Sequence, residues 1–191
     1  MEALFGIMTA FGLSASAGLN AYIPLLVVGV IAHYTDWINL NPPYDLLSNP
    51  WVLIVVSVLL IIEMLADKIP AVNHVNDIIQ TGIRPAAGAI IFAASAHAIT
   101  NVHPVIAIIC GMLVSGGVHV VKSAAVRPAV TATTGGAANV PVSIAEDVAA
   151  MALSILSIVI PVLVLVLLTL FIALIIWWIW RRAQRNHETA S

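Results

Sequence analysis

Nine of the sixteen charged side chains lie between positions 63 and 147, inside a sequence that is otherwise strongly apolar. They are Glu63, Asp67, Lys68, Asp77, Arg84, Lys122, Arg127, Glu146 and Asp147. Ionisable groups at membrane depth are costly, so they usually face a protein interior or a water-filled cavity and mark a pathway or a site. Prolines and glycines are frequent in the same region, and non-helical backbone at membrane depth is restricted in the same way. The sequence therefore predicts a polar site built from interrupted helices.

Five side chains are candidates for binding a substrate. They are Arg84, Arg127, Lys122, Asn20 and Asn73. Guanidinium groups suit phosphate and carboxylate, which predicts a small organic anion or an anionic lipid head group as the substrate. Lys122 has an alternative role, since a lysine near the end of a span can simply extend its amine to the membrane interface.

Five further side chains are candidates for coupling transport to protons or to a cation. They are Asp67, Asp77, Glu146, Asp147 and His119. Glu146 follows Ser143 at the spacing of a helix capping box, so capping is an alternative role for it. Asp147 has no such alternative and is the stronger candidate. His119 titrates near neutral pH and could relay protons, but a packed, hydrogen-bonded histidine fits the sequence equally well.

Residues 71–84 carry a polar stripe at helical spacing. It consists of Asn73, Asn76, Asp77, Gln80 and Arg84, which fall on one face of a helix. An amphipathic helix at the membrane interface would have this pattern. So would a helix whose polar face lines a cavity, and the acid and the base near its two ends favour that second interpretation.

The composition indicates a membrane protein with a single integral domain over residues 1–191. The chain is 61% hydrophobic and only 8% charged, whereas soluble domains have about 25% charged residues. A net charge of −2 argues against a nucleic-acid partner. No protease-like or zinc motif is present, so we expect no enzyme activity, no metal and no cofactor. The single cysteine excludes an internal disulfide.

Hydropathy and turn residues predict an all-α, polytopic transmembrane bundle of about six spans with interrupted or re-entrant helices. A stretch of about 39 apolar residues is too long for one crossing, so we divide it near Pro161 into a helical hairpin. The expected spans cover residues 3–32, with a bend near Pro24, and residues 51–66, 85–99 (extended on its N-terminal side) and 105–121, followed by the two halves of 142–180.

The charge distribution predicts the orientation of the chain. Trp177, Trp178 and Trp180 precede Arg181 and Arg182, as expected for a cytoplasmic membrane face. The loop over residues 33–50 has no lysine or arginine and fits the outside. Six spans would place both termini on the cytoplasmic side of the membrane.

Two pairs of short segments resemble each other and suggest an inverted repeat. Residues 16–21 (SAGLNA) are similar to residues 115–120 (SGGVHV), and residues 68–70 (KIP) are similar to residues 139–141 (NVP). Inverted repeats with broken helices are common in secondary transporters, whose sites lie near the midplane. Chance similarity within an apolar chain is the alternative.

Four stretches resemble the bacterial integral membrane family labelled domain-of-unknown-function 4126. They are residues 14–24 (SASAGLNAYIP), 66–70 (ADKIP), 131–136 (TATTGG) and 143–147 (SIAED). The resemblance covers most of the chain and implies a bacterial multi-span membrane protein, without implying an activity. Asn73 stands where many relatives would have an acid.

These observations favour a small transporter, proton- or cation-coupled, that moves an anionic small molecule or lipid head group through a charged midplane site. Its partners would be the lipid bilayer and that substrate, and homo-oligomerisation stays open. An oligomeric cation channel or metal-ion permease is the first alternative. A structural membrane protein whose charges form ion pairs is the second.

Overall fold

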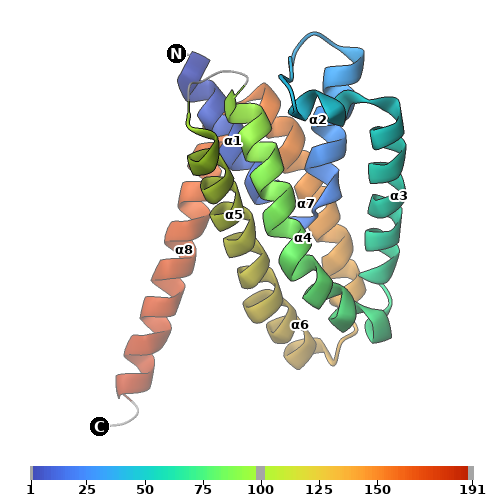
Figure 1. Ribbon diagram of the computed structural model, residues 1–191. Coiled ribbons are helices and arrows are strands. Elements are labelled where there is room, and N and C mark those ends of the chain that lie inside the picture. Colours follow the sequence, from blue (N-terminus) through green and yellow to red (C-terminus); the bar gives the residue numbers. More distant parts are fainter. Residues whose placement is uncertain (1, 98–101, 189–191) are drawn as a thin grey trace.

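The computed structural model describes residues 2–97 and 102–188, and within them every regular element is helical (Figure 1). The predicted all-α class is therefore confirmed. The elements are α1 (Glu2–Leu19), α2 (Tyr22–Tyr34), the 3-10 helix η1 (Tyr44–Ser48), α3 (Pro50–Ala66), α4 (Pro70–His97), α5 (Pro104–Val121), the π-helical turn η2 (Lys122–Val126), α6 (Arg127–Thr134), α7 (Asn139–Val159) and α8 (Pro161–Glu188).

Three helical segments are long and apolar enough to cross a membrane. They are Val75–Ala96, Pro104–Thr134 and Asn139–Val159. Shorter apolar helices accompany them, and both α3 and α8 expose large apolar side chains such as Ile62 and Leu170. An apolar surface of this extent suits lipid better than water. These features fit a membrane protein.

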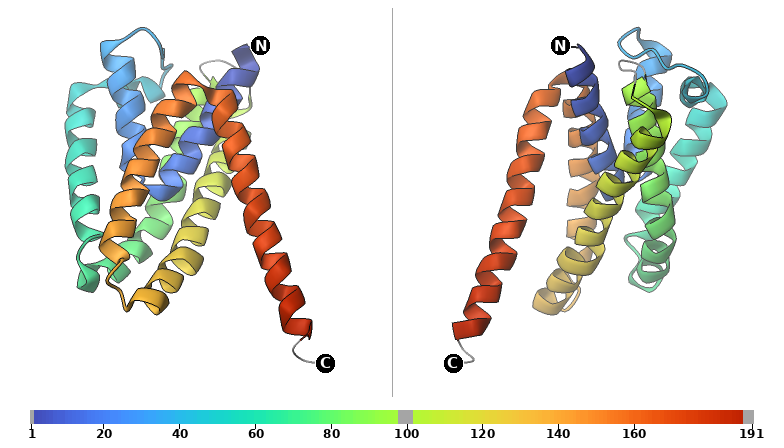
Figure 2. Two further views of the ribbon diagram at one scale, coloured as in Figure 1. Left: turned by 180° about the vertical axis from the view of Figure 1, so that it is seen from behind. Right: turned by 60° about the vertical axis from the view of Figure 1, so that its left-hand side comes forward.

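The first predicted span is wrong in one respect. Residues 3–32 do not form one helix that bends at Pro24; the chain breaks at Asn20 and Ala21. The Oδ1 atom of Asn20 accepts hydrogen bonds from the backbone N–H groups of Tyr22 (3.1 Å) and Ile23 (3.2 Å), so the asparagine satisfies the free donors at the start of α2. The helices α1 and α2 then form a hairpin that turns back inside the bundle (Figures 1 and 2).

This hairpin changes where the two ends of the chain lie. The helix α1 begins at the end of the bundle that carries the loop between α2 and α3, whereas α8 ends at the opposite end (Figure 1). The expected arrangement had both termini on one side. The difference arises because α1 and α2 together return to the end of the bundle from which they start (Figure 1).

The middle helices extend beyond the expected ranges. Residues 85–97 of the third expected span form the second half of α4, which begins at Pro70 and contains Pro85 in its interior, so the expected N-terminal extension is present. Residues 98 and 99 lie outside the described residues. The fourth expected span ends at Val121, but the helical path continues through η2 and α6 to Thr134. It stops at Gly135 and Gly136, whose φ angles of 61° and 90° favour glycine.

Close packing of small residues joins α4 to α5. A side chain at Gly88 would collide with the Ser115 side chain and the Gly111 carbonyl, and one at Gly111 would collide with the Gly88 carbonyl. Small residues allow membrane helices to approach in this way.

The apolar core continues from this contact through Ile91 of α4 into the α1–α2 hairpin, where Leu13 and Val28 are fully buried, as is Ile91. The predicted division near Pro161 is confirmed, because α7 ends at Val159 and α8 begins at Pro161.

Candidate functional site

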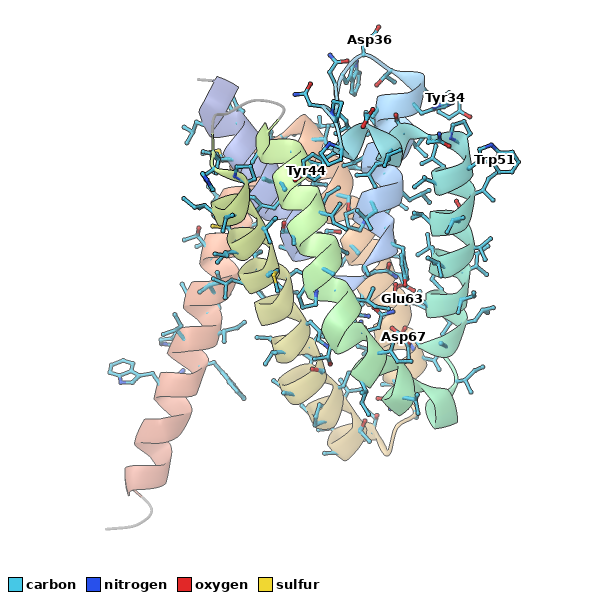
Figure 3. The ribbon with its side chains drawn as sticks, viewed as in Figure 1. Tyr34, Asp36, Tyr44, Trp51, Glu63 and Asp67 are labelled. Atoms are coloured by element: carbon cyan, nitrogen blue, oxygen red, sulfur yellow. The ribbon has the colours of Figure 1, made fainter. Side chains whose placement is uncertain are left out.

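All nine charged side chains of the central region take part in ion pairs between 2.8 and 3.8 Å. Seven of them are joined directly: Glu63, Asp67, Asp77, Glu146, Arg84, Lys122 and Arg127. Lys68 and Asp147 form a separate pair, which the tip of the α1–α2 hairpin links to the seven by hydrogen bonds, and the five acids and four cations together are called the network. They come from α3 and the turn after it, α4, η2, α6 and α7. Figure 3 shows Glu63 and Asp67 on the inner side of the lower half of α3.

Asp67 is the centre of the network. Its Oδ2 atom lies 2.9 Å from an Arg127 nitrogen, 3.6 Å from Lys122 Nζ and 3.8 Å from an Arg84 nitrogen. Its Oδ1 atom accepts a 2.6 Å hydrogen bond from Asn76. Burial acts to raise the pKa of Asp67, but the cations Lys122, Arg127 and Arg84 and the Asn76 amide lower it, and the net direction is below its ordinary value. Asp67 is therefore held as a carboxylate.

Arg84 is completely buried and holds three elements together. It donates to Glu63 Oε1 (2.8 Å), to the Gly18 carbonyl (3.2 Å) and to His119 Nδ1 (3.3 Å). Its own carbonyl accepts a 2.6 Å hydrogen bond from Ser115. A buried guanidinium needs such partners on several sides, because an unpaired charge in the interior costs several kcal/mol.

His119 uses both of its ring nitrogens. Nδ1 accepts from Arg84, and Nε2 lies 3.2 Å from Thr81 Oγ1. Because the Thr81 hydroxyl donates to the Asp77 carbonyl, the imidazole must be the donor in its contact with Thr81. The hydrogen-bond geometry thus assigns a neutral histidine with its proton on Nε2.

Lys122 and Arg127 share the carboxylate of Glu146. Oε2 lies 2.9 Å from Lys122 Nζ and 3.4 Å from an Arg127 nitrogen. Arg127 also contacts both oxygens of Asp77, at 3.1 and 3.0 Å. This part of the network reaches the bundle surface, since the Asp77 side chain is 20% exposed and that of Arg127 is 12% exposed.

The tip of the α1–α2 hairpin points into the network. The last carbonyls of α1, on Gly18 and Leu19, accept hydrogen bonds from Arg84 (3.2 Å) and Lys122 (3.0 Å). A helix C-terminus carries partial negative charge, so cations are favourable there. On the other side of the tip, Asn20 Nδ2 donates to Asp147 (3.0 Å).

Asp147 connects the hairpin tip to the turn between α3 and α4. Its second oxygen lies 3.1 Å from Lys68 Nζ. Asn20, Lys68 and Asp147 thus link two segments that lie far apart in the sequence.

The structure brings together almost all of the residues that the sequence proposed as a site. Nine of the ten candidates belong to this network or contact it, and the side chain of the tenth, Asn73, lies outside the described part. The polar stripe of α4 faces inward, since Asn76 and Gln80 are buried, and so the interfacial-helix interpretation does not hold. The capping-box role of Glu146 is also wrong, because α7 begins at Asn139 and Glu146 lies in its second turn.

Glu63 and Lys68 belong to the network, but the sequence predicted no specific role for either of them. Glu63 lies one turn before Asp67 on the same face of α3, and Lys68 follows Asp67 directly. The i, i+4 spacing of two acids in an apolar helix was the available signal for Glu63. Lys68 is identified as part of the network only by its contact with Asp147 in the structure.

Comparison with protein families gives a match over residues 7–181 to DUF4126, a domain of unknown function. The chain belongs to this family. The matched range includes the α1–α2 hairpin and all nine charges of the network, so the site lies within the family domain. No curated protein and no solved structure matches the chain.

In the network of this DUF4126 protein, each of the four cations is paired with at least one acid. Among the described residues no group of three or more His, Cys, Asp or Glu side chains is arranged to hold a metal ion. An anion that bound at one of these cations would compete with the carboxylate already paired to it, and protonation of that carboxylate would weaken the pair.

Proposed function

We propose that the protein is a small proton-coupled membrane transporter for an anionic small molecule or an anionic lipid head group. The observation that carries this proposal is the α1–α2 hairpin, whose tip ends inside the bundle against Arg84, Lys122 and Asp147. Secondary transporters commonly bind substrates and coupling ions where broken helices meet inside the membrane.

Substrate binding is assigned to the cations near the hairpin tip. Arg127 and Lys122 share Glu146; Lys122 is buried, whereas Arg127 and Glu146 are 12% and 10% exposed, so an anion would approach from the Arg127 side. A phosphate or carboxylate would replace the Glu146 carboxylate there, because a guanidinium binds either group in the same way. The release of Glu146 would then require a proton, so that no unpaired charge is left in the interior.

The topology that supports this mechanism has five crossings and one re-entrant hairpin. The crossings are α3, α4, the path from α5 to α6, α7 and α8. Arg181 lies over the Trp177 ring at 4.9 Å, and an arginine beside aromatic residues favours the cytoplasmic interface. We therefore assign the C-terminal end to the cytoplasm and the start of α1 to the outside of a bacterial inner membrane. The inverted repeat and an oligomeric assembly stay predictions.

A flux experiment tests the proposal. The full chain is reconstituted in liposomes with an internal pH dye, a pH gradient is imposed, and phosphate, small carboxylates and vesicles containing an anionic lipid are compared. We expect one anion class to accelerate proton movement with saturable kinetics. Arg127→Gln and Asp147→Asn should each reduce this rate at least about tenfold, as expected when a contact worth about 1.4 kcal/mol or more is lost.

Matched controls separate this function from its alternatives. Thr133→Ala changes an exposed hydroxyl that bonds only to carbonyls of its own helix, and it should leave the flux unchanged. Ionic current without saturation would favour the cation channel. Anion flux that is the same in wild type, Arg127→Gln and Asp147→Asn would reject the assignment of the site.

A further inference from the structure

Glu63 is the one acid of the network with a buried oxygen that has no partner. Its Oε1 atom accepts from Arg84, whereas its Oε2 atom is buried and makes no hydrogen bond among the described residues. The residue as a whole is 2% exposed. A bare carboxylate oxygen in such a position costs several kcal/mol, whereas a protonated one needs only an acceptor.

The charge balance of the network also favours a protonated Glu63. Five carboxylates face four cations, which leaves an excess of one negative charge in the interior. The acids at the centre and the rim are well satisfied: Asp67 and Asp147 each have partners on both oxygens, and both oxygens of Asp77 contact Arg127. One proton on Glu63 would make the network neutral.

The helix α4 carries a buried acceptor that has no partner among the described residues. Asn76, Gln80 and Arg84 are spaced by four residues and share one face of α4. Asn76 bonds to Asp67 and Arg84 bonds to Glu63, so Gln80 lies between these two pairs. Gln80 is 2% exposed, and its Oε1 atom is also buried without a partner.

We infer that Glu63 is a second proton-binding carboxyl of the site, beside Glu146, protonated on Oε2 in this arrangement, with Gln80 as the acceptor of its O–H group. In this state Oε1 still accepts from Arg84 as a carbonyl oxygen. The inference rests on the proposed function for its role: loss of the proton to water restores a carboxylate that draws Arg84 toward it, and uptake of a proton weakens that hold. No other bond is made or broken.

The surroundings of Glu63 contain several other ionisable groups. Arg84 on α4, Asp67 one turn along α3, Lys122 on η2 and Tyr22 on α2 all act on it electrostatically. His119 does not compete for the proton, because its two nitrogens are engaged by Arg84 and Thr81. Its protonation on Nδ1 would break the contact with Arg84 and add a fifth positive charge.

Infrared difference spectroscopy during a pH titration of the full chain in liposomes tests the inference. A protonated buried carboxyl has a C=O stretching band that a carboxylate lacks. We expect the wild type to show one such band, lost at high pH. Glu63→Gln should remove it, since the amide resembles the protonated acid in shape and can still bond to Arg84 and Gln80. Asp45→Asn removes an exposed carboxyl of η1 that takes no part in the network, so it is the matched control and should retain the band.

A second variant keeps the test valid if Glu63→Gln folds poorly. Gln80→Met removes the proposed acceptor and should shift the C=O stretching band to the position of a carboxyl whose O–H group makes no hydrogen bond. A band that persists in Glu63→Gln, or one that Gln80→Met does not move, would overturn the inference, as would a wild-type spectrum without the band.

The flux assay separates this inference from the transport proposal. Loss of the band in Glu63→Gln supports Glu63 as the proton site even if the wild type moves no anion, and in that case only the proposed transport is rejected. Saturable, proton-coupled flux that survives in Glu63→Gln would support transport but reject Glu63 as the coupling residue.

Discussion

The two halves of α4 are buried by opposite means. Before Pro85, the helix buries the polar side chains Asn76, Gln80 and Arg84. Asn76 bonds to Asp67 after α3, and Arg84 bonds to α3, α5 and the hairpin tip. After Pro85 it buries small and apolar residues, among them Gly88 and Ile91, against α1 and α5. The same helix is thus held by polar and charged pairs in its first half and by close packing of small and apolar residues in its second half.

This difference shows which substitutions each half of α4 can tolerate. In the apolar half, the energy depends on space, because small residues let two backbones approach and nothing larger fits. In the polar half, the energy depends on the balance of charges, because removing one member of a pair leaves the other buried and unpaired. Paired substitutions should therefore rescue the polar half and fail to rescue the apolar half.

Arg84→Met should have the largest effect on stability. It removes the hydrogen bonds that the Arg84 side chain donates to Glu63 Oε1 and to the Gly18 carbonyl. Breaking a buried pair in this way costs about 3–5 kcal/mol. Thermal unfolding in detergent, followed by circular dichroism, measures the loss. The double variant Arg84→Met with Glu63→Leu should recover most of it. Equal instability of the single and double variants would contradict the balance argument.

Gly88→Ala should have the next largest effect. The new Cβ atom would collide with the Ser115 side chain and with the Gly111 carbonyl, and overpacking of this kind costs about 1–3 kcal/mol. Gly82→Ala on the same helix is the matched control, since nothing lies within 4 Å of a Cβ atom there. The same detergent unfolding assay applies, and the comparison fails if the two alanine variants unfold alike.

Ser115→Ala should have a smaller effect in the same assay. Its hydroxyl donates to the Arg84 carbonyl where the two halves of α4 meet. Hydrogen bonds between membrane helices contribute about 0.6 kcal/mol on average. Ser115→Thr should be worse than Ser115→Ala, because its additional methyl group would press on the closely packed Gly88. The opposite order would mean that the hydrogen bond matters more than the space.

Asp77→Asn should be the mildest change in the network. The side chain is 20% exposed, and its partner Arg127 keeps Asp67 and Glu146. Partly exposed ion pairs contribute about 0–1 kcal/mol. The free energy of unfolding should therefore fall by less than about 1 kcal/mol, and the decrease should be smaller still in high salt. A loss as large as that of Arg84→Met would show that the rim and the centre of the network are not distinct.

Sequence patterns predicted the chemistry of the site better than its scaffold. Stripes at helical spacing correctly grouped Asn76, Gln80 and Arg84, because a helix fixes which side chains share a face. The break at Asn20 was missed, since hydropathy is equally high on both sides of it. What makes the chain turn back there is a pair of contacts, of Asn20 with the start of α2 and with Asp147, and the second partner lies 127 residues away.

The sequence by itself determined that this chain is helical, apolar and charged in its centre, because those properties follow from composition and from local spacing. It also determined the division at Pro161, where the fixed φ of proline and its missing N–H group begin a new helix. Only the tertiary structure decided that α1 and α2 form a hairpin with its tip among the charges, and that Glu63 has an oxygen without a partner. Both depend on which helices are neighbours, and that depends on contacts between residues far apart in the chain.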